Sequence, residues 1–418
     1  MKIKSIKKIK LSNPIKFYDI EVEKYHNFCI TDNNIITHNS SLEEAIIGMA
    51  QDFVGTNNIN LLSPKGQFGS RIKGGEDSAS PRYIFTRLSD ISSYIFRKED
   101  NDVLDYLDDD GAPIEPKYYV PIIPMVLVNG AFGLGTGYSS NVPMFNPMDI
   151  ISYLGNKIQG KKTKEVLPYY KGFKGGIIYD AEGGKYITRG IYDKPNANVI
   201  RITELPIGMW NDEYFKKLDK LIEDKIIKDY VKNCTDTVID IKLILTKEMM
   251  EELLRGGNVY KKLNLETYIS VKNMHLFDAD CKIKKYNNQY DIIDDFYKIR
   301  LEYYKKRKDF QLEEFKKEIK IIQNRMKFLK LVIDGEITIY RRSRELVEKD
   351  IEKSGIEKVE DSYSYLLNMS IMSFTKDRLQ ELKEEYDKTK LKYKELNDTT
   401  EETIWMKELT ELKGKIKL

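Results

Sequence analysis

The sequence predicts an α+β protein made of several domains. Its 418 residues are enough to bury more than one hydrophobic core. Up to about residue 290, short apolar stretches typical of strands are mixed with amphipathic helical stretches. Beyond that point, apolar residues at helical spacing stand among many charged residues. The chain therefore combines β-containing modules with a long helical C-terminal part.

Composition limits the classes of function. Charged residues make up 32% of the chain, the mean hydropathy is -0.50, and the net charge of +3 is too small to prove a nucleic-acid partner. No apolar run approaches the length of a membrane span. The three cysteines, Cys29, Cys234 and Cys281, have neither pairing nor metal-ligand spacing. We expect a cytoplasmic protein without a membrane partner.

The first 38 residues are predicted to form short strands. Residues 1–10 alternate lysine with isoleucine, and residues 15–22, 27–31 and 35–38 are apolar runs separated by polar turns. The pattern then becomes helical, with Ser40 or Ser41 placed to cap the helix N-terminus. A domain boundary is therefore expected at this point.

The residues at the boundary, His38, Asn39 and Ser40, have a specific chemical capability. An asparagine side chain can attack its own backbone carbonyl and cut the chain, and a neighbouring histidine can assist the proton transfer. A serine hydroxyl can accept an acyl group. The same triplet is also an ordinary helix start, and that interpretation is favoured when the triplet stands alone.

The surrounding sequence favours the chemical interpretation. The segments YDIEVEKYHNF and IITHNS resemble the last two sequence blocks of an intein. The resemblance implies that Asn39 cyclises, that His38 assists it, and that Ser40 is the first residue retained after splicing. It gives supporting roles to His26 and Asp19.

The N-terminal blocks of an intein, including its nucleophile, have no room before Met1. Residues 1–39 are therefore expected to be the C-terminal fragment of a split intein, joined to the protein that it splices. A degenerate intein or a shortened sequence is the alternative, although the intact splice-junction triplet argues against degeneration. A split intein together with the lysine, isoleucine and asparagine bias suggests a bacteriophage, and hence the host-cell cytoplasm.

Residues 66–83, GQFGSRIKGGEDSASPRY, form a glycine-rich polar loop that ends in arginine and tyrosine. Glycine is costly inside helices and strands, so this backbone is expected to approach another group closely. The guanidinium of Arg82 matches phosphate oxygens, and the phenol of Tyr83 can serve as nucleophile and as leaving group. The alternative is that Tyr83 only begins an apolar strand or helix beside a solvated arginine.

Helical stretches on both sides of this loop predict a module that could present a nucleophile beside a DNA groove, as winged-helix proteins do. Residues 119–143 then place a predicted strand, MVLVN, before a glycine-rich run. A dinucleotide-binding loop is rejected there, because Ser139, Ser140 and Pro143 stand where its helix should begin.

Five motifs resemble, in order, the DNA breakage and reunion region of type IIA DNA topoisomerases, most closely the eukaryotic and T4-like phage enzymes. They are AIIGMAQDFVGTNNINLLSPKGQFGSR, GGEDSASPRYIFT, PIIPMVLVNGAFGLGTGYSSNVPMFNP, ITELPIGMWNDEY and TTEETIWMKELTEL. The resemblance implies that Tyr83 forms a 5′-phosphotyrosyl bond and that Arg82 steadies the phosphate. Leu134 stands where the family usually has isoleucine, the apolar wedge inserted between base pairs.

The loop also departs from the family. Glu76 stands where relatives usually carry lysine, which removes a positive charge beside the DNA. Arg71 and Lys73 are expected to bind DNA. The family's Gly-Leu-Lys-Pro and His-His-Gly stretches are missing before Ser40 and are expected beyond the splice junction. The EDSA segment lacks the spaced aspartates of a Toprim site, so no metal ligand is assigned; the resemblance implies that a partner subunit binds Mg²⁺ and ATP.

The second half is predicted to contain two further domains. Residues 148–289 mix strands such as NVIRITELP with the helix NDEYFKKLDKLIED, and the resemblance implies an α/β tower that extends the DNA-contacting surface. His275 within it is expected to have a structural or surface role. Residues 290–418 contain two long charged helices around a small apolar segment. The resemblance implies an antiparallel coiled coil with a helical dimer gate.

The predicted domains are a β-rich intein fragment (1–39), a winged-helix-like cleavage domain (40–147), the tower (148–289) and the coiled coil with its gate (290–418). The leading hypothesis is the cleavage subunit of an ATP-dependent type IIA topoisomerase, made as a split-intein precursor. Its expected partners are double-stranded DNA, an N-terminal half, a second copy of the chain and an ATPase/Toprim subunit. The alternative is a DNA-bending or coiled-coil scaffold protein that does not cleave DNA.

Overall fold

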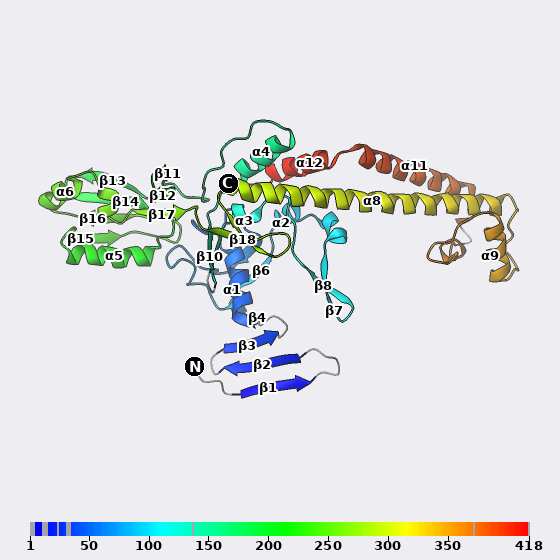
Figure 1. The fold of residues 1–418 in the computed structure, drawn as a ribbon, viewed down its shortest axis with the longest axis horizontal. Coiled ribbons are helices and arrows are strands. Elements are labelled where there is room, and N and C mark those ends of the chain that lie inside the picture. The colour runs from blue at the N-terminus through cyan, green and yellow to red at the C-terminus, as the bar shows by residue number, and fades with distance from the viewer. Residues whose placement is uncertain are drawn as a thin grey trace. The chain divides into compact units, whose positions relative to one another are not determined.

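The structure is a computed structural model, drawn as a ribbon in Figure 1. Its residue contacts divide the chain into two compact units. It describes residues 5–10, 16–22, 25–30, 35–135, 138–370 and 373–416, but not the side chains of residues 1–41 or 135–138. The first unit comprises residues 1–95, 123–297 and 409–418, and the second comprises residues 96–122 and 298–408. This division does not follow the four predicted domains, whose bounds remain predictions.

The N-terminal strands form one antiparallel sheet in the order β1–β2–β3–β4. They are β1 (Ser5–Lys10), β2 (Lys16–Val22), β3 (Tyr25–Ile30) and β4 (Ile35–His38), and helix α1 (Asn39–Ala50) follows directly. The strands predicted from the alternating pattern are confirmed, as is the change to a helix at Asn39.

After α1, the chain forms a small two-stranded sheet. Strand β5 (Leu62–Lys65) pairs antiparallel with β6 (Phe85–Leu88), and the short helix α2 (Ser92–Ile95) follows. The 3₁₀ turn η1 (Pro81–Tyr83) lies immediately before β6. Ala50, Phe68 and Ile84 form a buried apolar cluster that joins α1, the glycine-rich loop and the start of β6.

Residues 125–128 are helical, which corrects the predicted strand over MVLVN. They form α3 (Met125–Val128), and the backbone N–H of Leu127 donates to the carbonyl of Pro124 at 2.9 Å. A short apolar run does not distinguish a buried strand from a buried helix, and proline is favoured at a helix start. The glycine-rich run that follows forms the antiparallel strands β9 (Ala131–Gly135) and β10 (Tyr138–Val142).

The rest of the first unit is an α/β arrangement. Its larger sheets have the strand orders β11–β12–β17 and β13–β14–β16–β15. The strands are β11 (Gly176–Asp180), β12 (Lys185–Arg189), β13 (Ile191–Asn196), β14 (Val199–Glu204), β15 (Asp229–Lys232), β16 (Ile241–Ile244), β17 (Glu266–Ser270), β18 (Met274–Phe277) and β19 (Ile283–Tyr286). The helices are α4 (Pro147–Ile158), α5 (Asn211–Glu223), α6 (Lys247–Leu254) and α7 (Val259–Lys262).

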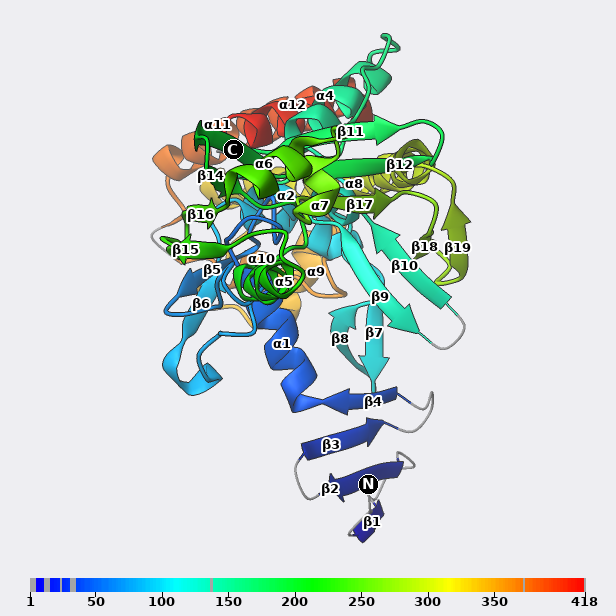
Figure 2. The same ribbon diagram turned by 90° about the vertical axis from the view of Figure 1, so that its left-hand side faces the viewer.

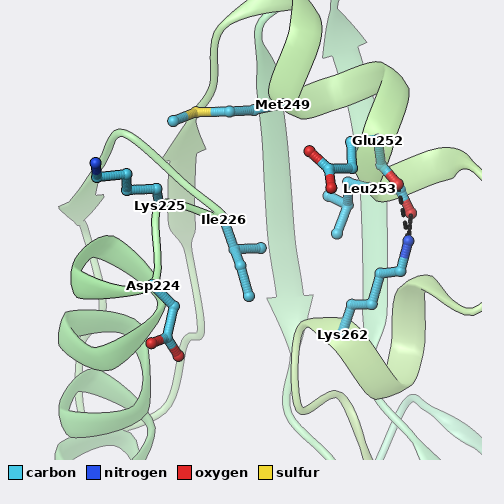
Figure 3. A pocket seen from close by; sticks show the side chains of 7 residues that line it. All are labelled: Asp224, Lys225, Ile226, Met249, Glu252, Leu253 and Lys262. Carbon is cyan, nitrogen blue, oxygen red and sulfur yellow. Dashed lines mark hydrogen bonds between the residues drawn. The ribbon is translucent and has the colours of Figure 1, made fainter.

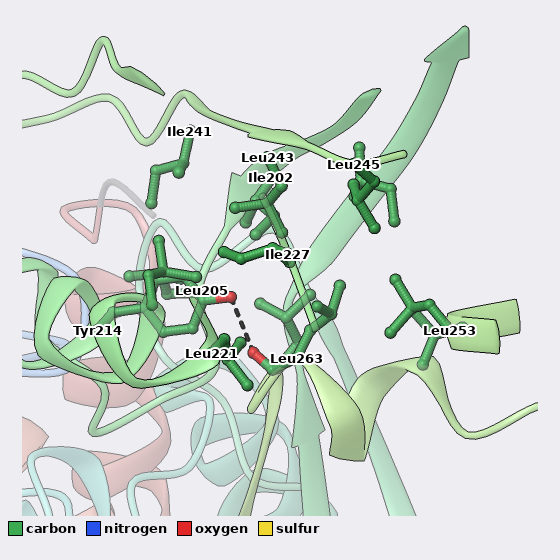
Figure 4. Packing of buried hydrophobic residues seen from close by; sticks show 14 of the residues in the cluster. Ile202, Leu205, Tyr214, Leu221, Ile227, Ile241, Leu243, Leu245, Leu253 and Leu263 are labelled. Carbon is green, nitrogen blue, oxygen red and sulfur yellow. Dashed lines mark hydrogen bonds between the residues drawn. The ribbon is translucent and has the colours of Figure 1, made fainter. Parts of the chain in front are cut away.

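The main core of this α/β part lies between the four-stranded sheet and its helices (Figure 4). Alternate residues of β14 are buried, as expected for a strand with one face on a core. Tyr214 of α5 is fully buried, and its hydroxyl donates to the carbonyl of Leu263 at 2.8 Å. That hydrogen bond satisfies the one polar group that the tyrosine brings into the core.

The second unit is mainly helical. Its elements are η2 (Lys98–Val103), β7 (Tyr106–Asp109), β8 (Ala112–Pro116), most of α8 (Gln289–Ile333), α9 (Arg344–Lys353), α10 (Ser364–Leu367), α11 (Lys376–Asp398) and the first part of α12 (Glu401–Lys413). Helices α8 and α11 lie side by side through Ile322, Leu329 and Leu382 (Figure 1). The two long helices are therefore confirmed, while the coiled coil and the dimer gate stay predictions.

A buried charge network lies inside the second unit. Asp100 accepts hydrogen bonds from Arg300 at 2.8 and 3.3 Å and from Arg307 at 3.2 Å. Arg307 also donates to Glu408 at 2.7 Å, and the hydroxyl of Tyr304 donates to Glu408 at 2.6 Å. Because the side chains of Arg300 and Asp100 are almost completely buried, these charges depend on one another for compensation.

Candidate functional site

The glycine-rich loop is held together by the carboxylate of Asp77. It accepts a hydrogen bond from the backbone N–H of Ser70 at 2.8 Å, one from the Ser70 hydroxyl at 2.5 Å, and one from Gln67 at 3.3 Å. Burial acts to raise the pKa of Asp77, but the hydrogen bonds outweigh it and leave the pKa below its ordinary value. The charged carboxylate is therefore the form that holds the loop.

The glycines of this loop allow it to pack closely against the protein itself. A Cβ atom on Gly74 would lie 2.3 Å from Nε1 of Trp210, and one on Gly75 would lie 2.3 Å from Nε2 of Gln51. Gly69 and Gly75 meet backbone to backbone, and all three glycines have positive φ. These close approaches are made to Trp210 and Gln51 of the protein itself. An approach of the loop to a phosphate stays a prediction.

Replacing Gly74 with alanine is expected to open the loop. The new methyl group would collide with the indole of Trp210, and alanine is strained at the φ of +65°. We expect the free energy of unfolding to fall by roughly 1–3 kcal/mol, and tryptic cleavage after Arg71 and Lys73 to become faster.

Gly160→Ala is the matched control, because Gly160 has nearly the same φ, +64°, but open space around its Cβ position. Both variants would be compared by thermal unfolding and by limited proteolysis. Equal loop cleavage in the two variants would contradict a role for the contact with Trp210.

The turn η1 presents Tyr83 to solvent. The backbone N–H of Tyr83 donates to the carbonyl of Ser80 at 2.9 Å, and the next residue, Ile84, is buried in the cluster with Phe68. The Tyr83 side chain is 71% exposed, and Arg82 is exposed beside it. A hydrogen-bonded turn followed by a buried anchor thus holds the Arg82 and Tyr83 side chains outward.

The structure does not support Arg71 as a DNA ligand. Its side chain is buried, forms an ion pair with Glu204, and donates to the carbonyl of Leu205 at 3.1 Å. The sequence could not reveal this, since Glu204 lies 133 residues away. Lys73 and Glu76 are exposed on the same loop, so Lys73 stays a predicted DNA contact.

The predicted wedge residue Leu134 projects from an exposed hairpin. It lies on β9 and is 79% exposed. The base of the hairpin is fixed by Asn129, whose side chain accepts from the N–H of Ile59 at 3.0 Å and donates to its carbonyl at 2.8 Å. Gly130 has a φ of +70°, and a Cβ there would lie 2.8 Å from the Val142 carbonyl oxygen.

A distant segment braces the second strand of the hairpin, and the sequence did not reveal it. The Asn273 side chain donates to the Ser139 hydroxyl at 2.6 Å, and the Asn273 carbonyl accepts from the N–H of Asn141 at 2.8 Å. The backbone N–H of His275 donates to the Ser140 hydroxyl at 3.2 Å. Strands β10 and β18 are neighbours in Figure 2, in agreement with these bonds. The structural role expected for His275 fits this position.

The predicted residues fall into separate features. Among the described residues, no hydrogen bond or ion pair joins the turn η1 to the β9–β10 hairpin. Asp19 lies in β2, His26 in β3 and His38 at the end of β4, while Asn39 and Ser40 begin α1. In backbone register, His38 faces Asn27. The side chains of these five intein residues lie outside the described part, so their proposed chemistry stays a prediction.

The first unit also contains two cavities. One, of about 210 Å³, is lined by residues between α5 and α7 (Figure 3). One of its two lysines, Lys262, donates to the carbonyls of Glu252, Leu253 and Arg255 and thereby closes the end of α6. The other cavity, of about 190 Å³, includes Arg71 in its lining. Lys262 and Arg71 are thus already used by the fold.

Within the described residues, no group of three or more His, Cys, Asp or Glu side chains is placed to hold a metal ion. The expectation that a partner subunit binds Mg²⁺ and ATP stays a prediction. A search of the described helices found none with the length and apolar character needed to span a membrane.

Comparison with known proteins gives a consistent result. Residues 37–410 match the family model for the A-type subunits of DNA gyrase/topoisomerase IV. The chain is 39% identical to DNA topoisomerase 2 of Arabidopsis thaliana over 89% of this chain and 28% of that protein. It is 34% identical to DNA topoisomerase 2 of Acanthamoeba polyphaga mimivirus over 89% of this chain and 35% of that protein.

A solved structure is similar as well. The topoisomerase II DNA-binding, cleavage and re-ligation domain of Plasmodium falciparum matches with a TM-score of 0.82 and 34% identity, over 90% of this chain and 55% of that one. The chain spans about a third of the length of the curated relatives cited above.

Proposed function

The chain belongs to the family of DNA gyrase/topoisomerase IV A-type subunits, and from this membership we propose that residues 40–418 cut and rejoin double-stranded DNA as part of an ATP-dependent type IIA topoisomerase. The observation that carries the proposal is the exposed pair Arg82 and Tyr83, held outward on a hydrogen-bonded turn. The non-cleaving scaffold alternative is not favoured by the relatives.

Tyr83 acts as the nucleophile. Its phenol oxygen attacks a DNA phosphorus atom, the bond from phosphorus to O3′ breaks, the phenol loses its proton, and the O3′ leaving group gains one. The cut strand is then joined to Tyr83 through its 5′ phosphate. In religation the 3′ hydroxyl attacks the phosphotyrosyl phosphorus and Tyr83 leaves. Arg82 donates hydrogen bonds to the phosphate oxygens, which stabilises the developing charge in both directions.

The remaining parts of the reaction come from partners. A separate ATPase/Toprim subunit binds Mg²⁺ and ATP, and a second copy of this chain supplies the other Tyr83 for the opposite strand. The two copies associate through the helical segment between α8 and α11, whose buried apolar residues include Val347, Ile351 and Leu366. Leu134 enters the duplex and bends it, and Lys73 contributes a phosphate contact.

A plasmid assay tests the proposed function. The chain spliced to its N-terminal half, the ATPase/Toprim subunit of the same system, ATP and Mg²⁺ are incubated with supercoiled plasmid, and the reaction is stopped with detergent. We expect linear DNA with protein covalently attached, and resealing when the metal is chelated before the detergent is added. DNA binding that leaves no covalent adduct after denaturation would support the scaffold alternative instead.

The first 39 residues form the C-terminal fragment of a split intein in this proposal. Asn39 attacks its own carbonyl carbon with its side-chain nitrogen, which breaks the peptide bond to Ser40 and closes a succinimide. Before that, the Ser40 hydroxyl attacks the acyl group of the other half, displaces the nucleophile of the N-terminal intein fragment and forms an ester. The Ser40 amine that cyclisation frees then attacks the ester carbonyl, the ester C–O bond breaks, and the hydroxyl regains its proton, which leaves a peptide bond. In support, the family match begins at residue 37, beside this junction.

Splicing predicts a defined change in mass. Co-expression with the N-terminal half is expected to remove residues 1–39 and to create a new peptide bond to Ser40, seen by intact-mass spectrometry. Asn39→Ala should block release of the fragment, because the cyclising amide is lost. Asn34→Ala, to which the resemblance gives no role, serves as the control. Splicing that persists in Asn39→Ala would refute the proposed junction.

A further inference from the structure

Strand β9 exposes two large apolar side chains. Phe132 is 75% exposed and Leu134 is 79% exposed. Side chains alternate between the two faces of a strand, so residues two positions apart lie on the same face. Phe132 and Leu134 therefore project together from one side of the β9–β10 hairpin.

The hairpin differs from the rest of the surface in its chemistry. Residues 131–142 contain no charged side chain, whereas 32% of the whole chain is charged. Phe132 is not among the buried side chains of the core. An exposed, uncharged pair of this size indicates an apolar binding surface rather than a solvated strand.

The pair is also held rigidly. Asn129 ties the base of the hairpin to Ile59 through two hydrogen bonds, and Gly130 lets β9 approach Val142. Asn273 braces the opposite strand, β10. Since hydrogen bonds hold the hairpin on both strands, it loses little conformational entropy when a ligand binds.

We propose that Phe132 is a second DNA-inserting residue, which acts beside Leu134 so that the hairpin opens two base steps instead of one. This inference rests on the proposed function, because it needs Leu134 to face DNA. Two residues of a strand span about 6.6 Å, and two base-pair rises span about 6.8 Å. A strand that runs along the helix axis therefore sets the Phe132 ring two base-pair rises from Leu134.

The chemistry of the occupant favours duplex DNA. An apolar wedge can open a base step from the minor groove, and an aromatic ring can stack on the base face that is thereby exposed. Asn141 lies opposite Phe132 on β10 and shares its face, where an amide group suits sugar and base edges. The absence of carboxylates on the hairpin removes repulsion from phosphates.

The test uses the full chain and a duplex of about 30 base pairs in which a single flexible TA step directs the bend. 2-Aminopurine, whose fluorescence rises when a base is unstacked, is placed at successive positions in separate duplexes. Dyes at the two ends report bending by energy transfer. For the wild-type chain we expect increases at two positions about two base pairs apart.

Phe132→Ala is expected to abolish the increase at one position, to keep the other, and to weaken binding about 5-fold or more. Leu134→Ala should abolish the other increase. The control is Phe277→Ala, since Phe277 is 71% exposed on β18 but does not lie on the hairpin, and it should bind and bend DNA like the wild type. Unchanged melting temperatures would verify that the variants are folded.

Two results would overturn the inference. Loss of bending in Leu134→Ala together with normal fluorescence in Phe132→Ala would leave Leu134 as the only wedge. A loss of self-association in Phe132→Ala without any change in DNA fluorescence would make Phe132 a protein contact. If Leu134→Ala also behaves like the wild type, Leu134 does not insert into DNA. That result would contradict the role of Leu134 in the proposed function and not only the inference about Phe132.

Discussion

Tyr83→Phe is expected to abolish covalent attachment of the chain to DNA. The substitution removes only the attacking oxygen, so cleavage should fall by roughly three orders of magnitude or more, as when the nucleophile of a catalytic unit is deleted. The side chain is 71% exposed, and loss of its hydroxyl leaves no buried group without a partner. Folding and non-covalent DNA binding should therefore be unchanged.

The assay for this variant combines detergent-trapped cleavage with filter binding of intact DNA. Tyr179→Phe is the control, because Tyr179 is another exposed tyrosine of the same unit, at 55% exposure. It should cleave like the wild type. A Tyr83→Phe chain that still forms adducts would mean that another residue is the nucleophile.

Asp100→Ala is expected to destabilise the second unit by about 3–5 kcal/mol. It would leave the fully buried guanidinium of Arg300, and that of Arg307, without the carboxylate that both contact. Burial acts to lower the pKa of Arg300, but Tyr304 and Asp100 outweigh it and the pKa is raised. The arginine therefore stays charged and bears the full cost of losing its partner.

Denaturant unfolding measures this effect within one unit. The chain has two tryptophans, and in a Trp210→Phe background Trp405, which is buried in the second unit, reports on that unit alone. Asp102→Ala is the control, since Asp102 is an exposed carboxylate of the same segment and should change stability by less than about 0.5 kcal/mol. Similar stabilities for the two variants would contradict a structural role for the network.

Local sequence patterns predicted much of the fold. The alternating runs identified β1 to β4, and the serines after Asn39 marked the start of α1. The prediction failed at residues 125–128, where a short apolar run fits both a strand and a helix, and the preceding proline favours the helix. The compact units also differ from the predicted ranges, because residues 96–122 belong with the C-terminal helices.

The sequence predicted those parts of the candidate site whose residues stand close together along the chain. Arg82 and Tyr83 are neighbours, and Leu134 stands in its own glycine-rich run. The ion pair of Arg71 with Glu204 and the contact of Asn273 with Ser139 join residues 133 and 134 positions apart. The link from Asp100 to Arg300 spans 200 positions. Packing decides such contacts, and no spacing rule in one sequence reveals them.

Mapping the covalent link tests the central claim most directly. The assembled enzyme is trapped on DNA, the adduct is digested with protease and nuclease, and the modified peptide is sequenced by mass spectrometry. The chain contains 28 tyrosines, so a nucleotide found on one of them identifies the nucleophile among many candidates. We expect a nucleotide joined through its 5′ phosphate to Tyr83 and to no other tyrosine. A nucleotide on a different residue, or a link through the 3′ end, would contradict the proposed reaction.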